Sequence, residues 1–371
     1  MSGSNDALGD TDAQTREFLL RFGFDAERLA ELRARLHASA ARADNHVVGE
    51  LEPVDAEALR ALPNPGSEEH RELTEAGEAA IRAGRVGVLM LAGGMATRFG
   101  AVVKALAEAY DGKSFLDLKL EDAARVASRL DARVPVLIMS SFATDEALRA
   151  ALGDTNVALP IEVFAQEVSL RLTPDGALHR DAGGALSPYA TGHGDLTFAL
   201  RRSGALRRFV DAGGELLLMS NVDNLVATLD PAVIGAHLVG GKVVTAEVAP
   251  KVPGDQGGIP LSVDGVPQVV EGFRLPPGFD QDSVPVFNTN TMVLDARAID
   301  RDFELDWFVV NKKVDGAPVV QFERLVGQVT AHLPTQFLQV PRDGSRCRFA
   351  PIKVPEDLER QRELIAAVLR G

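Results

Sequence analysis

Residues 88–104, which read VLMLAGGMATRFGAVVK, decide the fold of this chain. The apolar run that opens them is too short for a helix and does not alternate, which is typical of a strand buried on both faces of a sheet. Gly93 and Gly94 let the main chain approach a ligand with its N–H groups, and Arg98 and Lys104 add positive charge. The pattern predicts a phosphate-binding loop; the alternative is an ordinary glycine-rich turn between strand and helix.

This loop differs from two common phosphate-binding motifs. The third glycine of GxGxxG and an acidic residue at the end of the next strand are both missing, which argues against a dinucleotide fingerprint. The P-loop pattern, GxxxxGK followed by Ser or Thr, is not matched either. The loop therefore indicates phosphate binding of another kind.

Buried strands and amphipathic helices alternate after the loop. Apolar runs predict further strands at 134–141, 159–166, 214–224 and 242–249, and helical spacing predicts helices at 114–130, 144–153, 195–213 and 230–241. This alternation predicts an α/β fold with a doubly wound, mixed and mostly parallel sheet. Ligands of such sheets lie beyond the carboxyl ends of the strands.

The flanking segments have other patterns. Before the loop, we predict two amphipathic helices within 11–43, a proline-rich linker with one short helix at 51–70, and a helix at 72–84. After the central strands, we predict antiparallel strands added to the same sheet at 251–295 and a helix at 320–333. Late strands at 337–342 and 348–354 and a terminal helix from 355 complete the predicted elements.

Composition and charge exclude several classes of protein. Hydrophobic content of 46% and charged content of 25% are ordinary for a globular chain of 371 residues. The 39 Lys and Arg against 53 Asp and Glu give a net charge of -14, which argues against partners such as nucleic acid or anionic membranes. The single cysteine, Cys347, excludes an intramolecular disulfide, and no apolar span approaches the ~20 residues that cross a bilayer. We expect a cytoplasmic protein.

Polar residues end several of the predicted strands. Asp223, in SNVDN after the apolar run ELLLM, suits Mg²⁺, which takes few protein ligands and uses substrate phosphates for the rest; the alternative is an Asx turn or a helix cap. His193 lies between glycines in TGHGD, where a polar contact is more common than a proton shuttle. FNTNT, residues 287–291, has a pattern that suits sugar hydroxyls or a strand-ending turn, and Lys313 and Lys353 suit phosphates or solvent.

The quoted stretches, taken together, resemble the UTP–glucose-1-phosphate uridylyltransferase (UDP-glucose pyrophosphorylase) family of eukaryotic type, and more distantly UDP-N-acetylglucosamine pyrophosphorylases. The matching stretches follow the family's order from residue 86 to 353: LAGGMATRFG with Lys104, KSFLDLKLED, VPVLIMSSFAT, FAQEVSLRL, TGHGD, LLLMSNVDNLVATLD, QGGIPL, VFNTNTMVL, VVNKKVDGAPVVQFE, and VPR with FAPIK.

The resemblance implies a role for each matched position. Nucleotide contacts would come from Ala92, Gly93, Gly94, Gln166, Gly192 and Asn221; contacts to the sugar phosphate from His193, Gly258, Glu271, Asn288 and Asn290; charge at the reacting phosphates from Lys104, Arg98 and Lys313; and the Mg²⁺ ligand would be Asp223. The substrates it implies are UTP and a sugar 1-phosphate. No sequence feature points to an oligomeric state.

Three departures from the family pattern stand out. Val103 occupies the position of a proline before Lys104, and DGS, residues 343–345, is an insertion between VPR and RFAPIK. The sequence after FAPIK has no counterpart of the family's C-terminal β-helix domain, so we expect a Rossmann-like nucleotidyltransferase fold, similar to GT-A enzymes, without it. The domains we expect are an N-terminal helical extension at 1–85, a catalytic domain at 86–353 and a C-terminal helix at 354–371.

The resemblance leads to three hypotheses about function. The first is a Mg²⁺-dependent uridylyltransferase that forms UDP-glucose and pyrophosphate from UTP and glucose 1-phosphate. The second is the same reaction with N-acetylglucosamine 1-phosphate, galactose 1-phosphate or another sugar 1-phosphate. The third is a weakly active homologue that binds nucleotide sugars. Because the sugar phosphate itself supplies the nucleophile, the absence of a recognisable Ser or Cys nucleophile pattern is expected.

Overall fold

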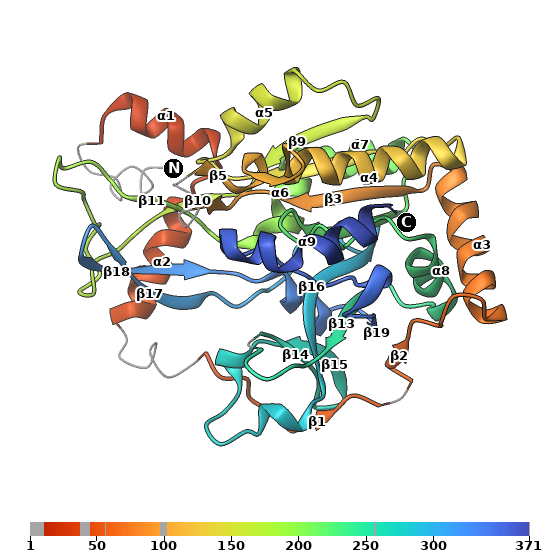
Figure 1. Ribbon diagram of the computed structural model, residues 1–371. Helices are drawn as coiled ribbons and strands as arrows, with labels where there is room; N and C mark the ends of the chain where they lie inside the picture. Colours follow the sequence, from red (N-terminus) through yellow and green to blue (C-terminus); the bar gives the residue numbers. More distant parts are fainter. Residues whose placement is uncertain (1–10, 38–44, 56, 97–101, 256, 371) are drawn as a thin grey trace.

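A computed structural model describes residues 11–37, 45–55, 57–96, 102–255 and 257–370 (Figure 1). Nine α-helices lie within these residues: α1 (Ala13–Arg21), α2 (Ala26–His37), α3 (Glu68–Arg82), α4 (Phe115–Leu130), α5 (Asp145–Gly153), α6 (Leu196–Arg202), α7 (Ala205–Asp211), α8 (Pro231–Gly240) and α9 (Pro355–Arg370). The central strands are β2 (Leu59–Ala61), β3 (Val86–Leu91), β8 (Val136–Ser140), β9 (Ile161–Ala165), β12 (Leu216–Asn221), β13 (Val244–Pro250), β16 (Val286–Asp295) and β19 (Thr335–Gln339).

The remaining strands form small sheets and hairpins. They are β1 (Leu51–Pro53), β4 (Met95–Ala96), β5 (Val102–Val103), β6 (Glu108–Tyr110), β7 (Lys113–Ser114), β10 (Val168–Leu170), β11 (Pro188–Ala190), β14 (Ile259–Val263), β15 (Val266–Val270), β17 (Phe308–Val314) and β18 (Ala317–Glu323).

The eight central strands form one mixed sheet in the order β2-β19-β13-β16-β12-β3-β8-β9. Seven of them run parallel, while β16 pairs antiparallel with both β12 and β13. The reversed direction of β16 brings its first residues to the edge where the parallel strands end. The predicted fold class, a mostly parallel α/β sheet, is confirmed, and the described residues contain no β-helix.

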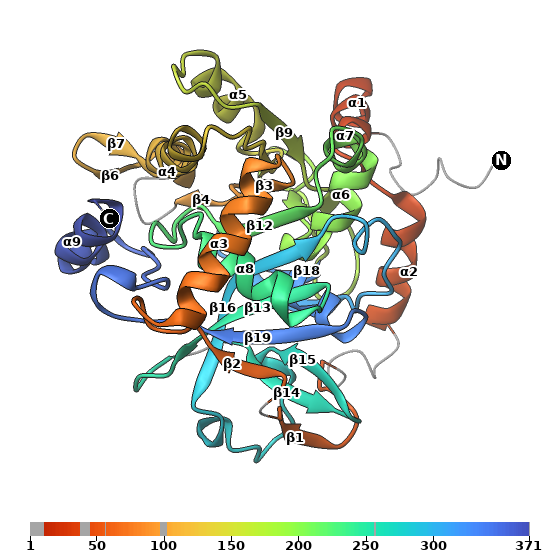
Figure 2. The ribbon, with the colours of Figure 1, turned by 90° about the vertical axis from the view of Figure 1, so that its right-hand side faces the viewer.

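Helices cover both faces of this sheet, as Figure 2 shows from its side. Successive side chains of β3 alternate between two apolar cores: Val88 and Met90 pack with α3, α4 and α8, while Leu89 and Leu91 pack with α6 and α7. A third core joins α1 and α2 to β10 and β18. These two N-terminal helices lie on the side of the molecule opposite to α3 and α8 (Figure 1).

The helices α3 and α8 pack with almost no side chain between them. A methyl group added at Gly77 would lie 1.8 Å from the carbonyl oxygen of Pro231, and one at Gly235 would lie 1.8 Å from that of Leu73. Each helix therefore contributes one glycine against the other's backbone. This contact joins α3 to the same core as the central strands.

Long-range pairing explains the main corrections to the predicted elements. Residues 51–70, predicted as a linker with a short helix, contain β1 and β2, which pair with β14 and β19. The added antiparallel strands divide between two sheets, because β14 and β15 form a separate sheet with β1 and only β16 enters the central one. Neither arrangement has a local sequence signal, since the partner strand lies more than 200 residues away for β1 and β2.

Three further corrections have local causes. The predicted helix 195–213 is broken at Gly204, whose φ of +74° ends α6 and begins α7. The predicted helix 320–333 is instead the end of β18 followed by the 3-10 helix η7 (Val326–Ala331). The predicted strand 348–354 is a loop, because the Asn224 side chain satisfies the backbone of Arg348 and Ala350 in place of a neighbouring strand.

Other predictions about the ends of the chain have mixed outcomes. The two N-terminal helices, the helix ending at Gly84 and the C-terminal helix are confirmed, while residues 1–10 and 38–44 lie outside the described part. The domain limits at 85 and 353 stay a prediction. No helix among the described residues combines the length and apolarity that a membrane span needs.

We predict that Gly235→Ala lowers the free energy of unfolding by about 2 kcal/mol or more, because the added methyl group forces α3 and α8 apart. Denaturant unfolding followed by circular dichroism measures this loss. Gly153→Ala is the matched control: it also lies in a helix, but no atom lies within 4 Å of its added methyl group. Its effect should stay within about 1 kcal/mol, and equal losses in both variants would contradict the proposed backbone contact.

Candidate active site

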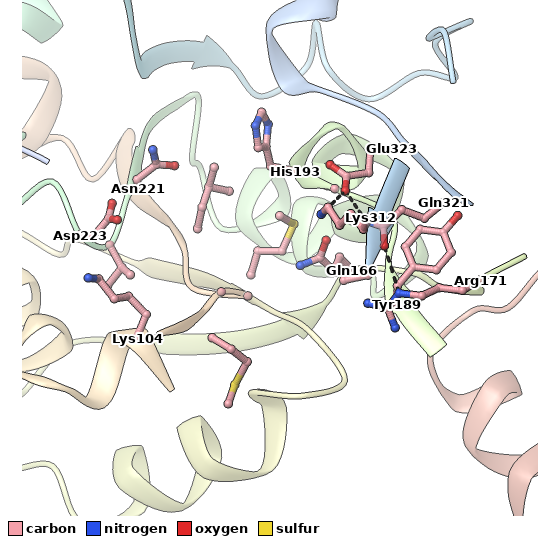
Figure 3. Close-up of a pocket in the computed structure, with 18 residues that line it drawn as sticks. Lys104, Gln166, Arg171, Tyr189, His193, Asn221, Asp223, Lys312, Gln321 and Glu323 are labelled. Atoms are coloured by element: carbon pink, nitrogen blue, oxygen red, sulfur yellow. Dashed lines mark hydrogen bonds and ion pairs between the residues drawn. The ribbon is translucent and has the colours of Figure 1, made fainter. Parts of the chain in front are cut away.

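A cavity of about 620 Å³ opens at the carboxyl ends of the central strands (Figure 3). One part of its wall comes from the ends of β3, β8 and β12 and the segments that follow them, and the rest comes from β11, β17, β18 and the segment after β9. The residues that line it are Leu91, Gly93, Gly94, Met95, Lys104, Met139, Gln166, Arg171, Tyr189, Ala190, Gly192, His193, Asn221, Val222, Asp223, Lys312, Gln321 and Glu323. This is the position at which an α/β sheet presents side chains to its ligand.

The glycine loop fits closely around Gln166. A methyl group at Gly93 would lie 2.2 Å from Nε2 of Gln166, and the Gly93 carbonyl oxygen accepts a hydrogen bond of 2.7 Å from the Ser141 hydroxyl. The Gln166 side chain is 6% exposed, and its Oε1 atom has no hydrogen-bond partner among the described residues. A buried amide oxygen of this kind is costly unless a ligand donates to it.

Lys104 and Asp223 face each other at one end of the cavity (Figure 3). The lysine begins the short 3-10 helix η3 (Lys104–Leu106), its backbone N–H donates to the Gly94 carbonyl at 3.1 Å, and its Nζ lies 4.8 Å from the centre of the Phe115 ring. Burial lowers the pKa of Lys104, against the attraction of Asp223. Burial also raises the pKa of Asp223, although Lys104 and Lys353 oppose this. Burial therefore outweighs the nearby lysines in its effect on the pKa of this carboxylate.

Lys119 of α4 holds the turn that carries Asp223 by hydrogen bonds to residues on both sides of it in the chain. Its Nζ donates to the Ser220 hydroxyl at 3.0 Å and to the Ala227 carbonyl at 2.5 Å, and it is 4% exposed. Burial lowers the pKa of Lys119 to about 8. From the other side, the backbone N–H of Ile352 donates to the Asp223 carbonyl at 3.1 Å. These hydrogen bonds fix the backbone of the turn from which the Asp223 carboxylate extends.

The TGHGD turn presents a neutral imidazole to the cavity. Gly192 has a φ of +93°, and a methyl group there would lie 2.5 Å from the Arg324 carbonyl oxygen. His193 Nδ1 accepts a hydrogen bond of 3.0 Å from the Val326 backbone N–H, which leaves the ring proton on Nε2. Burial lowers the pKa of His193 to about 4. At neutral pH the ring is therefore a hydrogen-bond donor and carries no charge.

A buried ion network holds this turn against the segment that carries Gln166. The Arg324 guanidinium pairs with Asp195 and, at 3.2 Å, with Glu167, and it lies between the rings of Phe198 and Trp307. Arg28 of α2 and Arg202 of α6 add two further cations, each at 2.7 Å from Glu167. Burial and the neighbouring Asp195 raise the pKa of Glu167. The carboxylates therefore depend on these arginines.

The residues assigned to the sugar form a group beside the cavity. Asn290 Nδ2 donates to Asn221 Oδ1 at 2.9 Å, and Asn290 has a φ of +57°, a conformation that non-glycine residues rarely adopt. The Gly258 carbonyl accepts a hydrogen bond of 2.8 Å from the Asn288 backbone N–H, and a methyl group at Gly258 would lie 3.1 Å from the Glu271 carboxyl group. Burial raises the pKa of Glu271.

The structure gathers eight of the named residues at the cavity and places the others nearby or elsewhere. The eight are Gly93, Gly94, Lys104, Gln166, Gly192, His193, Asn221 and Asp223. Ala92 is buried within the core, where its N–H donates to the Met139 carbonyl. Arg98 lies outside the described residues. Lys313 is exposed and is not among the lining residues described, whereas Lys312, its neighbour in β17, is.

Sequence reasoning missed one wall of the cavity. Arg171, Tyr189, Lys312, Gln321 and Glu323 line it, and Figure 3 shows them beyond Gln166. Arg171 donates to Gln321 at 3.1 Å, and Lys312 donates to Glu323 at 2.9 Å. In the sequence, this wall is indicated only by the alternation of residues in NKK (311–313) and VVQFE (319–323), because every second residue of a strand lies on the same face of its sheet.

Comparison with known proteins agrees with this geometry. A model of the UTP–glucose-1-phosphate uridylyltransferase family matches residues 41–364. The chain belongs to this family. Curated relatives named UTP–glucose-1-phosphate uridylyltransferase include one from Astragalus penduliflorus, 31% identical over 73% of this chain and 60% of that protein, and one from Saccharomyces cerevisiae, 30% identical over 80% and 63%. The chain spans about 60% of the length of such relatives.

Solved structures of nucleotide-sugar pyrophosphorylases share the fold. A UDP-glucose pyrophosphorylase mutant from Leishmania major superposes with a TM-score of 0.74 at 24% identity, covering 89% of this chain and 74% of that one. A UDP-N-acetylglucosamine pyrophosphorylase from Trypanosoma brucei gives a TM-score of 0.78 at 20% identity, covering 97% and 82%. At these identities the likeness establishes the fold, and it extends to relatives named for different sugars.

We predict that Arg324→Met lowers the free energy of unfolding at pH 7 by about 3–5 kcal/mol, because it leaves Asp195 and Glu167 buried without their shared cation. The deficit should narrow between pH 7 and pH 5, because burial and the neighbouring Asp195 raise the pKa of Glu167, so that protonation of this carboxyl group favours the folded state. Urea unfolding at both pH values measures this. Arg207→Met, which removes a cation with an 86% exposed side chain, should cost less than about 1 kcal/mol, and a similar loss in both variants would contradict the prediction.

A second prediction concerns Lys119. Because burial lowers its pKa from 10.5 to about 8, the unfolded chain binds one more proton between these pH values. The lysine should therefore make stability rise by up to about 1.4 kcal/mol per pH unit in this window, and Lys119→Met should remove that contribution. Unfolding of both proteins in urea from pH 7.5 to pH 10 measures the difference in slope. Parallel curves would show that Lys119 does not titrate there.

Proposed function

We propose that this protein transfers a uridylyl group from UTP to glucose 1-phosphate, forming UDP-glucose and pyrophosphate. The observation that carries this proposal is the pair Lys104 and Asp223, which face one cavity together with the Gln166 amide oxygen, buried and without a hydrogen-bond partner among the described residues. One end suits the reacting phosphates, and Gln166 suits the hydrogen-bonding edge of a base. Family membership supports the same reaction class.

The reaction needs positioned charge rather than a protein nucleophile. An oxygen of the sugar 1-phosphate attacks the α-phosphorus of UTP, a new P–O bond forms, and the bond to the departing pyrophosphate breaks. Lys104 neutralises charge on the phosphates, and the N–H groups of Gly93 and Gly94 hold the nucleotide. His193, neutral with its proton on Nε2, donates a hydrogen bond to a phosphate or sugar oxygen. No residue forms a covalent intermediate.

The residues present fit Mg²⁺ as the metal. Asp223 offers one carboxylate whose pKa is raised by burial, and no group of three His, Cys, Asp or Glu within the described residues forms a complete metal site. One carboxylate with water and substrate phosphates is what Mg²⁺ commonly uses. When bound, the ion would neutralise charge on the nucleotide phosphates. We propose Asp223 as its ligand, in a cytoplasmic enzyme.

The sugar is the finer part of the proposal. Asn221, Asn290, Asn288 and Glu271 offer amide and carboxylate groups that suit sugar hydroxyls. The same groups would accept galactose 1-phosphate, and relatives named for N-acetylglucosamine share the fold, so these are the second candidates. A third candidate is a weakly active homologue that binds nucleotide sugars, which Val103 before Lys104 motivates.

The test is pyrophosphate release from UTP across a panel of sugar 1-phosphates. We expect glucose 1-phosphate to give the highest kcat/KM, and Lys104→Ala and Asp223→Ala each to lower kcat by ~100-fold or more. Lys242→Ala removes an exposed lysine and should leave kcat unchanged. Binding of UDP-glucose without turnover of any sugar would reject the enzyme proposal. Wild-type turnover by Lys104→Ala would remove the lysine from the mechanism.

A further inference from the structure

A second cavity, of about 340 Å³, shares no lining residue with the active-site cavity described above. It lies where α4, the start of α8 and α9 meet the loop 345–348. Four arginines line it, Arg125, Arg129, Arg346 and Arg348, against one carboxylate, Asp230. In a chain with a net charge of -14, the lining of this cavity therefore has an excess of positive side chains.

The arginines are held in place by groups behind the wall. Arg125 pairs with Asp122 at 2.9 Å and Arg129 with Glu78 at 2.6 Å, and neither carboxylate lines the cavity. Within the described residues, each of these two arginines uses one guanidinium nitrogen in this way. Their remaining N–H groups are available to an occupant. A guanidinium fixed at one nitrogen loses less side-chain entropy when it binds a further anion.

The other two arginines come from the loop after β19. Arg346 donates to the Asn64 side chain at 3.2 Å and to the Pro63 carbonyl at 2.8 Å. Arg348 is 3% exposed and pairs with Glu247 at 2.7 Å, while Asp230 lies 3.8 Å from it and caps α8. Ser345, from the DGS insertion noted in the sequence, and Thr228 add hydroxyl groups. The insertion therefore helps to build this cavity.

We propose that this cavity, named here the arginine cavity, binds a phosphate group, either free phosphate or the monoester of a small sugar. Guanidinium groups recognise phosphate oxygens with paired N–H donors. A cluster of arginines is therefore better suited to a phosphate group than to an uncharged ligand. A volume of about 340 Å³ accepts a ligand of hexose phosphate size. The proposal is independent of the active-site chemistry.

Calorimetric titration at constant ionic strength tests the proposal, with inorganic phosphate in one arm and glucose 6-phosphate in the other. The double variant Arg125→Gln and Arg129→Gln should weaken binding of the preferred probe at least 10-fold. Tighter binding of glucose 6-phosphate identifies a monoester site, and equal or tighter binding of inorganic phosphate identifies a free-phosphate site. Should the double variant fail to fold, Arg125→Gln alone should weaken binding at least 3-fold.

Two control variants separate this cavity from other phosphate binding. Arg133→Gln removes an exposed arginine just beyond α4 and should leave the affinity unchanged. Lys104→Ala alters only the active-site cavity and should also leave it unchanged. Binding that is lost in Lys104→Ala but retained in the double variant would place the phosphate in the active site and overturn the proposal. Failure of both probes to bind the wild-type protein would overturn it as well.

Discussion

The Arg324 guanidinium joins three segments that build the active-site cavity. It follows β18, pairs with Asp195 at the end of the TGHGD turn, and pairs with Glu167, which follows Gln166 in the chain. The backbone carbonyl oxygen of Arg324 approaches Gly192 so closely that no side chain fits at that position. The segments that carry His193 and Gln166 are therefore joined through one buried cation. Arg324 is buried against the rings of Phe198 and Trp307, and its low exposure to solvent strengthens these charge interactions.

The cavity leaves several polar groups without full compensation. Within the described part of the chain the Gln166 amide oxygen has no hydrogen-bond partner, while Asp223 has a raised pKa and Lys104 a lowered one. Each of these is unfavourable in the folded protein and becomes favourable when a charged or hydrogen-bonding ligand enters. His193 is different, because its partner N–H and its burial fix it as a neutral donor before any ligand arrives. The cavity is thus prepared for a ligand that carries both a base and phosphates.

Sequence patterns gave the central part of the fold because its strands and helices depend on local periodicity. β3, β8, β9, β12 and β13 are short apolar runs of the kind that is buried on both faces of a sheet, and Gly93, Gln166 and Asp223 follow three of these strands. The missed elements depend on distant partners instead, as with β1 and β2. Arg324 could not be recognised because a buried arginine and an exposed one look alike in a sequence. The choice between Lys312 and Lys313 depends on strand register, which two adjacent lysines do not reveal.

The pairing of β2 with β19 has a consequence for how the protein is made. Leu59 of β2 lies opposite Phe337 of β19. The edge strand β2 can therefore pair only with residues near the other end of the chain. During synthesis β19 emerges long after β2, and β2 has no partner in the meantime. Such contacts between distant residues slow folding and leave strand edges open to other chains. Efficient production of this protein thus depends on keeping the nascent chain from associating until translation has passed β19.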